Sequence, residues 1–133
     1  YIQYAHARIC SILAERERRG SAFDPQFAIA NLDKLTMTQE YKLMRTLSSF
    51  GEIITTAGNN RSPHLIANYL QDLAADVHSY YNVKDENGNA IRILTEDENQ
   101  KGLQDAKLYL LMAAKQVLAN GLDLLGLSAP TKM

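Results

Sequence analysis

Apolar residues recur at intervals of three and four along most of the chain, and this spacing constrains the fold more than any other feature. Between residues 62 and 81, the recurring residues are Ile66, Tyr69, Leu70, Leu73, Val77 and Tyr80. Such spacing places them on one face of a helix, which must then pack against other elements. Alternation typical of β-strands does not extend beyond a few residues. The sequence therefore predicts an all-α protein.

Turn and capping residues predict the bounds of the first three helices. A helix over residues 1–19 stops at Gly20. A short helix follows, with Asp24 as its N-cap and Pro25 at its first position. A third helix, capped by a threonine at position 36 or 38, covers residues 38–56 with an apolar line of Leu43, Leu47, Phe50 and Ile54.

The second half of the chain predicts two longer helices separated by a polar loop. Ser62 caps a fourth helix that Pro63 begins and that ends near residue 81. The stretch NVKDENGNAIRILTEDENQ then predicts a surface loop, with a tight turn at ENGN and a short extended piece at AIRIL. The last helix covers residues 98–120 and is ended or bent by Asn120 and Gly121 before a final turn. These segments predict a bundle of about five helices.

Length, charge and cysteine content restrict the class of protein further. The 133 residues suffice for one domain with its own core. A formal net charge of −1 excludes a strongly basic surface that would bind any nucleic acid, although it permits a local basic patch. Cys10, the single cysteine, excludes an intrachain disulfide and favours a reducing, cytoplasmic setting. No apolar run approaches the length of about 18 residues that a membrane span requires.

Residue patterns of common catalytic and metal sites are absent from the sequence. The motifs HExxH, GxSxG and GxxxxGK[ST] do not occur. His6 and Cys10 lie four residues apart, but no nearby carboxylate completes a metal site, and a partly buried pair is the simpler interpretation. The acidic run at 96–98 suits the first turn of the last helix. We therefore expect no catalytic residue, bound cofactor or metal in this chain.

The first helix carries two stripes of different character. Stepping about 100° per residue, the core face is formed by Ile2, Ala5, Ile9, Ile12 and Leu13. The second stripe, centred about 110° away, holds Tyr1, Tyr4, Arg8, Ser11 and Glu15, and Tyr4 is placed to stack with Arg8. On spacing alone, this stripe is either a half-buried flank of the bundle or a surface that stacks on nucleobases. Similarly, Tyr80 and Tyr81 point about 100° apart, so that one faces inward.

Three motifs, in order, connect the whole chain to a known family. They are YIQYAHARICSIL at the start, SPHLIANYLQDLAADVHSYYN in the middle and AKLYLLMAAKQVLANGLDLLGLSAPTKM at the end. Together they resemble the C-terminal, DALR-type anticodon-binding domain of arginyl-tRNA synthetase. The sequence departs from the family pattern at Lys107, where arginine is common, at Val77, where phenylalanine is common, and in a longer, more polar loop at 82–99.

The resemblance implies a single tRNA-binding domain over residues 1–133, cut from the C-terminal end of a class I synthetase. The parent would ligate arginine to its tRNA with ATP and magnesium in an N-terminal catalytic domain that this sequence lacks. We expect the fragment to be non-catalytic, because the HIGH-type and KMSKS-type motifs of that class are absent. Because the chain starts at a tyrosine, we also expect it to be a piece of a longer protein. Its expected partners are the arginine tRNA and that catalytic domain, with no DNA and no membrane.

The resemblance also assigns tRNA contacts, because family members approach the anticodon loop with residues of all three motifs. Here the matching residues are Tyr4, Arg8, Tyr81 and Met133, with Tyr1 as a weaker candidate. Arginine anticodons share a central cytosine, so we expect strict recognition of that base by a group not yet identified. The motif residues His6 and Asn120 are interpreted as structural. Either phosphate contact or a solvated position is open to Arg16, Arg18, Arg19, Arg45 and Arg61, with solvation the simpler interpretation for each.

Two other classes of function stay open at this level. One is a helical protein-interaction module whose first-helix stripe binds another protein, which the near-neutral charge favours. The other is a small α-helical enzyme, which the absence of catalytic patterns disfavours. The anticodon hypothesis requires Tyr4, Arg8, Tyr81 and Met133 to lie on one exposed surface, and it fails if they lie on opposite sides of the bundle.

Overall fold

Helices form most of the computed structural model, which describes residues 1–20, 23–84, 87–88 and 93–133. In chain order the elements are α1 (Ile2–Arg18), α2 (Pro25–Ala30), the 3-10 helix η1 (Leu32–Lys34), α3 (Thr38–Ser48), α4 (Phe50–Asn59), α5 (His64–Tyr81), the 3-10 helix η2 (Glu98–Gln100) and α6 (Lys101–Leu124). The described residues contain no β-strand. The predicted all-α bundle is therefore confirmed.

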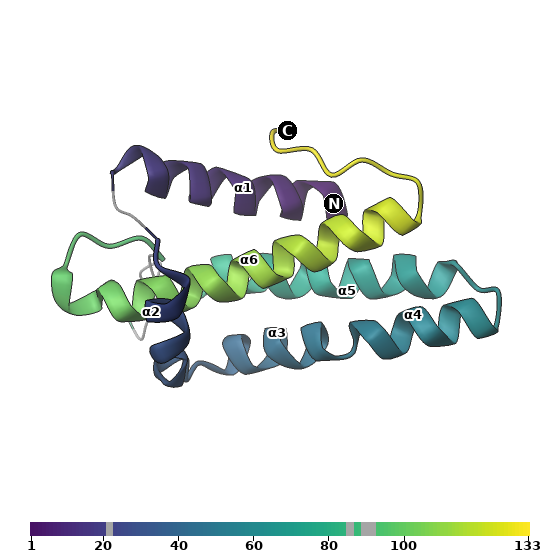
Figure 1. The fold of residues 1–133 in the computed structure, drawn as a ribbon, viewed down its shortest axis with the longest axis horizontal. Helices are drawn as coiled ribbons and strands as arrows, with labels where there is room; N and C mark the ends of the chain where they lie inside the picture. Colours follow the sequence, from purple (N-terminus) through teal and green to yellow (C-terminus); the bar gives the residue numbers. More distant parts are fainter. Residues whose placement is uncertain (21–22, 85–86, 89–92) are drawn as a thin grey trace.

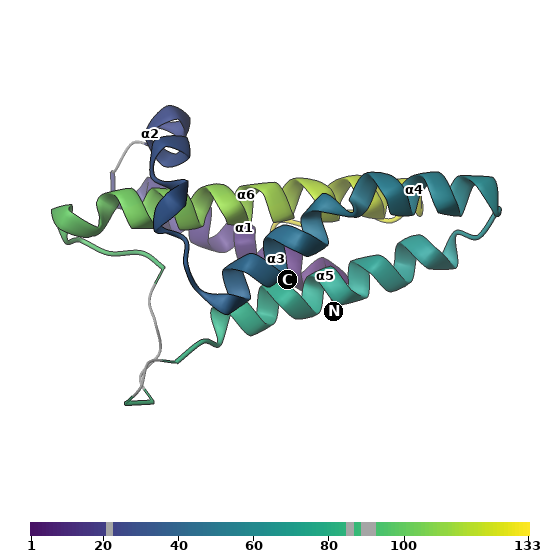
Figure 2. The same cartoon turned by 90° about the horizontal axis from the view of Figure 1, so that it is seen from below.

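The long helices α5 and α6 lie side by side through the middle of the molecule (Figure 1). Helix α1 packs against both from one side, and α3 packs against both from the other, while α4 continues along α5. Figure 2 shows α2 crossing α6 near the N-terminal end of that helix. Because α5 and α6 have neighbours on two sides, eight of the 18 residues of α5 and twelve of the 24 residues of α6 are buried.

The core lies between these layers and is built mostly from leucine. The large apolar side chains that are fully buried come from four helices: Ile9, Leu43, Leu70, Leu73, Val77, Leu108, Leu111, Leu118 and Leu122. The apolar line predicted for the fourth helix, from Ile66 to Tyr80, is buried throughout. On α1, Ala5 and Ile9 are fully buried, and Ile2, Ile12 and Leu13 pack against the core from its edge. The predicted core faces of both helices are therefore confirmed.

Helix ends near the N-terminus follow the predicted capping chemistry. Gly20 has a φ of +76°, a left-handed conformation that suits glycine and follows the end of α1. The Asp24 carboxylate accepts hydrogen bonds from the Gln26 and Phe27 amides at 3.0 and 3.4 Å. Pro25 occupies the first position of α2, where its lack of an amide proton has no cost.

The helix predicted over residues 38–56 is instead two helices, separated at Ser49. The Thr46 carbonyl accepts hydrogen bonds from the Ser49 hydroxyl at 2.9 Å and from the Tyr69 hydroxyl at 2.5 Å. Such side-chain bonds compete with the regular helical pattern and break it locally. The predicted threonine cap is also wrong, because α3 is capped at Met37, whose amide donates to the Glu40 carboxylate at 2.9 Å.

Helix α6 starts later and continues further than the sequence predicts. Residues 98–100 form η2, and the helix then runs through Asn120 and Gly121 to Leu124. A Cβ atom on Gly121 would lie 2.5 Å from a Leu70 methyl group, so this glycine permits close approach of α5 rather than a helix end. Two residues after the helix end, Gly126 has a φ of +74°, and the Leu127 amide bonds back to the Leu122 carbonyl at 2.9 Å.

Two smaller predictions concern segments that the described residues cover only in part. The expected tight turn at ENGN includes residues 86 and 89, and the expected extended piece at AIRIL includes residues 90–92, all of which lie outside the described ranges. Within those ranges, Asn120 does not cap a helix, since its side chain accepts a hydrogen bond from Gln116 at 2.8 Å on the exposed face of α6. Among the described residues, none of the helices combines the length and apolar character needed to cross a membrane.

Candidate nucleic-acid interface

Predicted contact residues from two distant parts of the chain meet where the start of α1 crosses the end of α5. The Arg8 guanidinium lies 4.3 Å above the centre of the Tyr81 ring. The Tyr4 ring stacks on the His78 imidazole, with 5.4 Å between ring centres and 22° between planes. Tyr1 meets the same imidazole edge-on at 5.0 Å. We call Tyr1, Tyr4, Arg8, His78 and Tyr81 the α1–α5 cluster.

Local sequence explains why these side chains face one another. Tyr1, Tyr4 and Arg8 are three and four residues apart, so they share one side of α1, and His78 and Tyr81 likewise share one side of α5. Small or fully buried residues such as Ala5 hold α1 close to the bundle. The prediction that one of the paired tyrosines faces inward is confirmed, because Tyr80 is 4% exposed.

A buried hydrogen bond fixes Tyr80 in the interior, and Tyr81, the next residue, faces α1. The Tyr80 hydroxyl donates to the Glu40 carboxylate at 2.6 Å in the interior, and burial raises the pKa of Tyr80 above its usual value. Its neighbour is rotated by one helical step and lies under Arg8. The Tyr81 hydroxyl donates to the Arg8 carbonyl at 3.4 Å, and burial also raises the pKa of Tyr81 despite the opposing charge of Arg8.

Exposure differs across the cluster in a way that the sequence did not predict. Tyr1 and Tyr4 are 68% and 48% exposed, whereas Arg8 and Tyr81 are half-buried. Arg8 stacks on Tyr81 instead of on Tyr4, because its side chain reaches across to α5 rather than along α1. The surface therefore presents the Tyr1 and Tyr4 rings beside the Arg8 guanidinium, which packs on the Tyr81 ring.

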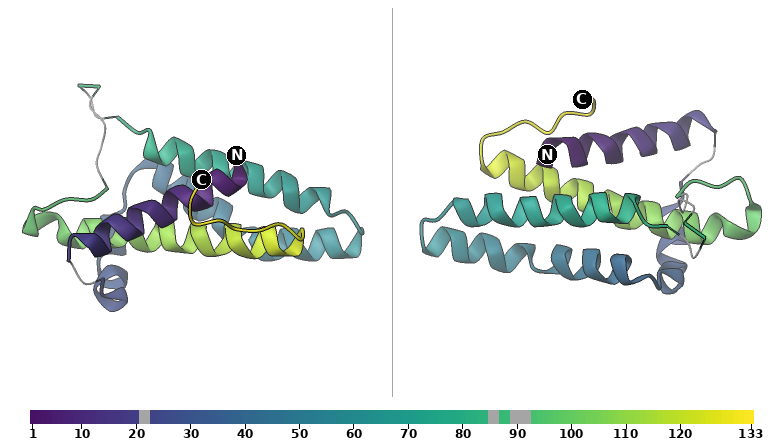
Figure 3. Two further views of the ribbon diagram at one scale, coloured as in Figure 1. Left: turned by 90° about the horizontal axis from the view of Figure 1, so that it is seen from above. Right: turned by 180° about the vertical axis from the view of Figure 1, so that it is seen from behind.

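The C-terminal tail reaches this end of α1 as well. The Gln3 side chain donates to the Ser128 carbonyl at 2.9 Å, and the His6 Nδ1–H donates to the Pro130 carbonyl at 2.9 Å. Figure 3 shows the two ends of the chain close together over the start of α1. Met133 ends the tail with 71% of its surface exposed, and the ring contacts and hydrogen bonds of the α1–α5 cluster do not include it. His6, 4% exposed, thus attaches the tail, in agreement with a structural role.

His78 is the member of the cluster that sequence reasoning missed. Arg8 Nη1 donates to His78 Nδ1 at 3.3 Å, so the imidazole touches three of the residues assigned from α1. Burial lowers the pKa of His78, and the Arg8 charge acts in the same direction, although a backbone contact at Tyr1 opposes them. The available signal was spacing, since His78 lies one turn before Tyr81 on the same face of α5.

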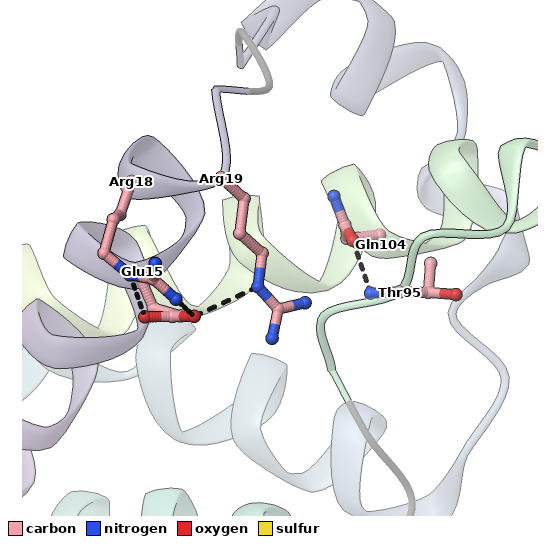
Figure 4. Close-up of polar contacts among 5 residues, drawn as sticks. All are labelled: Glu15, Arg18, Arg19, Thr95 and Gln104. Atoms are coloured by element: carbon pink, nitrogen blue, oxygen red, sulfur yellow. Dashed lines mark hydrogen bonds and ion pairs between the residues drawn. The ribbon is translucent and has the colours of Figure 1, made fainter.

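The five arginines considered for phosphate contacts differ in burial and in ion pairing. Arg16 is neither solvated nor available for phosphate, because it is 4% exposed and forms an ion pair with Asp105 at 2.6 Å. Arg18 and Arg19 both pair with Glu15, at 2.6 and 3.1 Å, on the surface of α1 (Figure 4). The Arg18 and Arg19 bonds lower the pKa of Glu15 to about 2. Arg45 and Arg61 are exposed.

Other polar groups near α1 connect neighbouring segments of the fold. In Figure 4 the Thr95 amide donates to the Gln104 side chain at 2.7 Å, which attaches the segment before η2 to α6. His6 Nδ1 and Cys10 Sγ are 3.7 Å apart, and no group of three or more potential metal ligands forms among the described residues. The chemistry that the α1–α5 cluster offers is therefore stacking and hydrogen-bond donation, which suits an unstacked nucleobase.

Comparison with known proteins gives a consistent answer. The chain is 45% identical over its full length to an arginine–tRNA ligase of Thioalkalivibrio sulfidiphilus and 44% identical to one of Coxiella burnetii, and it spans 21% of each. Among solved structures, the Thermus thermophilus arginyl-tRNA synthetase matches the whole chain with a TM-score of 0.80 at 37% identity, over 21% of its own length. A putative arginyl-tRNA synthetase from Campylobacter jejuni matches with a TM-score of 0.77 at 25% identity, over 26% of its length.

The match to a protein family covers nearly every residue. The DALR anticodon binding domain aligns with residues 2–133, which include all of the helices and the C-terminal tail. The resemblance found in three sequence motifs is thereby confirmed, and the chain spans about a fifth of the length of the relatives it matches. This chain belongs to the DALR anticodon-binding domain family.

Proposed function

We propose that this chain binds the anticodon stem-loop of an arginine tRNA, as the C-terminal domain of an arginine–tRNA ligase. The observation that carries the proposal is the α1–α5 cluster, where exposed rings of Tyr1 and Tyr4 stand beside the Arg8 guanidinium. Membership in the DALR family and the arginine–tRNA ligase relatives support the choice of tRNA. The overall charge of −1 requires binding by a local surface instead of a general attraction to phosphate.

In this proposal an anticodon base leaves the loop and stacks on the exposed Tyr4 ring. Base stacking of this kind contributes about 1–3 kcal/mol per base. Arg8, held in place by Tyr81, donates to the edge of the base or to its neighbouring phosphate. Met133, which ends a tail hydrogen-bonded to α1, contributes a further contact to the anticodon loop. Exposed Arg45 and Arg61 are available for phosphates of the stem.

The remainder of the parent protein would carry out the chemistry. Residues 1–133 would then be a single, non-catalytic domain, and the catalytic domain of the same chain would bind ATP, arginine and magnesium. The relatives have the length for this, because the chain spans 21% of them. A cytoplasmic location follows from a role in protein synthesis. The anticodon contact would serve to hold the acceptor end of the tRNA at that distant active site.

Binding of a synthetic anticodon stem-loop tests the proposal directly. Two RNAs are compared, one with the central cytosine of an arginine anticodon and one with uracil at that position, by fluorescence anisotropy at fixed salt. We expect tighter binding of the cytosine RNA. Equal binding of the two RNAs would exclude base-specific recognition, and the absence of binding to either would reject the proposal for this chain.

A protein-interaction module is the second candidate, and one surface favours it. An apolar groove of about 480 Å³ lies between α3, η1 and α6, lined among others by Leu32, Leu35, Met44, Leu47, Ala113 and Val117. Apolar grooves on a helical bundle are suited to protein partners and not to RNA. This candidate gains support if the stem-loop does not bind, and the groove and the α1–α5 cluster have no lining residue in common.

A further inference from the structure

We infer that His78 is a positioning residue, whose Nε2-protonated imidazole holds both Tyr4 and Arg8 in the orientation that RNA requires. This inference rests on the proposed function, since it concerns the same surface. His78 contacts the two residues through different parts of one ring: the ring face meets Tyr4 and the Nδ1 edge meets Arg8. One side chain of α5 therefore sets the geometry of two side chains of α1.

The direction of the hydrogen bond follows from the chemistry of its two partners. A guanidinium group has donors and no acceptor, so His78 Nδ1 must accept the Arg8 proton at 3.3 Å with its lone pair. The ring proton then belongs on Nε2. A second proton on Nδ1 would place two donors and two positive charges against each other, and Arg8 would leave its position over Tyr81.

The surroundings of His78 favour the uncharged ring. The groups that face it are Arg8 and Tyr4 from α1, together with the ring and the backbone of Tyr1. Burial lowers the pKa of His78, and the positive charge of Arg8 acts in the same direction, against a backbone hydrogen bond at Tyr1. The stacking contact with Tyr4 requires an aromatic ring at position 78. Histidine here supplies both a ring that stacks and a nitrogen that accepts a hydrogen bond. Phenylalanine supplies only the ring, and asparagine supplies only the acceptor.

Two substitutions separate the two contacts. His78→Phe keeps a ring for Tyr4 but removes the acceptor for Arg8, whereas His78→Asn keeps an acceptor but removes the ring. His64 at the start of the same helix is exposed and provides matched controls, His64→Phe and His64→Asn. We expect His78→Phe to weaken binding of the cytosine stem-loop by about 3- to 10-fold, the size of one net hydrogen bond. The His64 variants should bind like the wild type.

A double-mutant cycle shows whether His78 acts through Arg8. In the Arg8→Ala background, His78→Phe should have no further effect on the dissociation constant, because the residue it positions is already absent. Likewise, His78→Asn should have little further effect in the Tyr4→Ala background. Independent, additive losses in both cycles would overturn the inference, as would wild-type binding by both His78 variants.

Nitrogen NMR of the wild-type imidazole tests the same contact without any substitution. At pH 7 we expect a protonated Nε2 and an unprotonated, hydrogen-bonded Nδ1 in His78. A charged ring or the Nδ1-protonated tautomer would overturn the inference even if the variants do not fold. Failure of the proposed function is distinguishable, because it appears as equal wild-type binding of the cytosine and uracil stem-loops, whatever the state of His78.

Discussion

The two halves of α1 use arginine in opposite ways. Arg8, near the start, lies 4.3 Å over Tyr81 and donates to His78, and both of these partners are uncharged. Arg16, two turns later, is buried against the Asp105 carboxylate at 2.6 Å and contacts the Phe23 ring at 5.3 Å. The Tyr81 ring and the His78 imidazole orient the Arg8 guanidinium but do not neutralise its positive charge. A carboxylate neutralises that charge, so the residue becomes part of the interior.

This difference explains why only one half of the helix is a candidate for RNA binding. An anion such as a phosphate gains from a guanidinium whose charge is not balanced and whose position is already set. Arg8 satisfies both conditions and is half-buried, whereas Arg16 is 4% exposed. The sequence pattern does not distinguish the two residues, because both are arginines on one amphipathic helix. This contrast between Arg8, proposed to bind RNA, and Arg16, a structural arginine, can be tested by substitution.

The largest effect on stability should come from the half of α1 that contains Arg16. Asp105→Ala removes the carboxylate beside a buried guanidinium and should lower the free energy of unfolding by about 3–5 kcal/mol. Urea unfolding measures the loss, with Asp123→Ala on the exposed face of α6 as the control. Replacing both partners, as in Arg16→Met with Asp105→Leu, should recover much of the stability. A loss below about 1 kcal/mol for Asp105→Ala would contradict the structural role.

The adjacent tyrosines offer the next comparison. Tyr80→Phe removes a buried hydroxyl that donates to the Glu40 carboxylate at 2.6 Å, so it should cost about 1.5–3 kcal/mol of stability. Tyr81→Phe removes a longer bond of 3.4 Å to a backbone carbonyl and should cost about 0.5 kcal/mol. Thermal or urea unfolding of the two variants gives the ranking. Equal losses would mean that the two hydroxyls are equally bound in solution.

A smaller but more specific effect is expected for the functional half. Tyr4→Ala should weaken binding of the cytosine stem-loop by about 1–3 kcal/mol, because it removes the exposed stacking ring. The melting temperature should not change, since Tyr4 is 48% exposed. Tyr41→Ala on α3 is the matched control, with a tyrosine that is 50% exposed and lies outside the cluster. A large fall in melting temperature for Tyr4→Ala would show that this ring stabilises the fold.

The smallest effect should appear at Glu15, on the surface of the second half of α1. Its carboxylate pairs with Arg18 and Arg19 on the surface, which lowers its pKa to about 2 from an ordinary 4.5. The stabilisation of the folded state by these ion pairs is therefore present above pH 4.5 and is lost as the pH falls towards 2. Glu15→Gln should lower the melting temperature slightly at pH 7, and the difference should shrink in that window. A pH-independent difference would exclude the pairing as its cause.

Much of this fold is predictable from short-range patterns. The apolar line from Ile66 to Tyr80, the stop at Gly20 and the cap at Asp24 each depend on residues within one or two turns. The wrong threonine cap is also local, since Met37 bonds to Glu40 three residues later, but two other errors originate in contacts between distant elements. Tyr69 of α5 bonds to the Thr46 carbonyl and contributes to the break at Ser49, and Leu70 of α5 explains Gly121 within α6.

For the candidate site, the sequence alone determined that tyrosines and an arginine share a stripe of α1 distinct from its core face, and the ordered motifs indicated a tRNA partner. Tertiary structure decided what that stripe meets: His78 and Tyr81 of α5 support Arg8, Asp105 of α6 neutralises Arg16, and the tail hydrogen-bonds to α1. The physical reason is geometric. Helical periodicity states which residues share a face, but the partner of each face depends on how helices far apart in the chain cross.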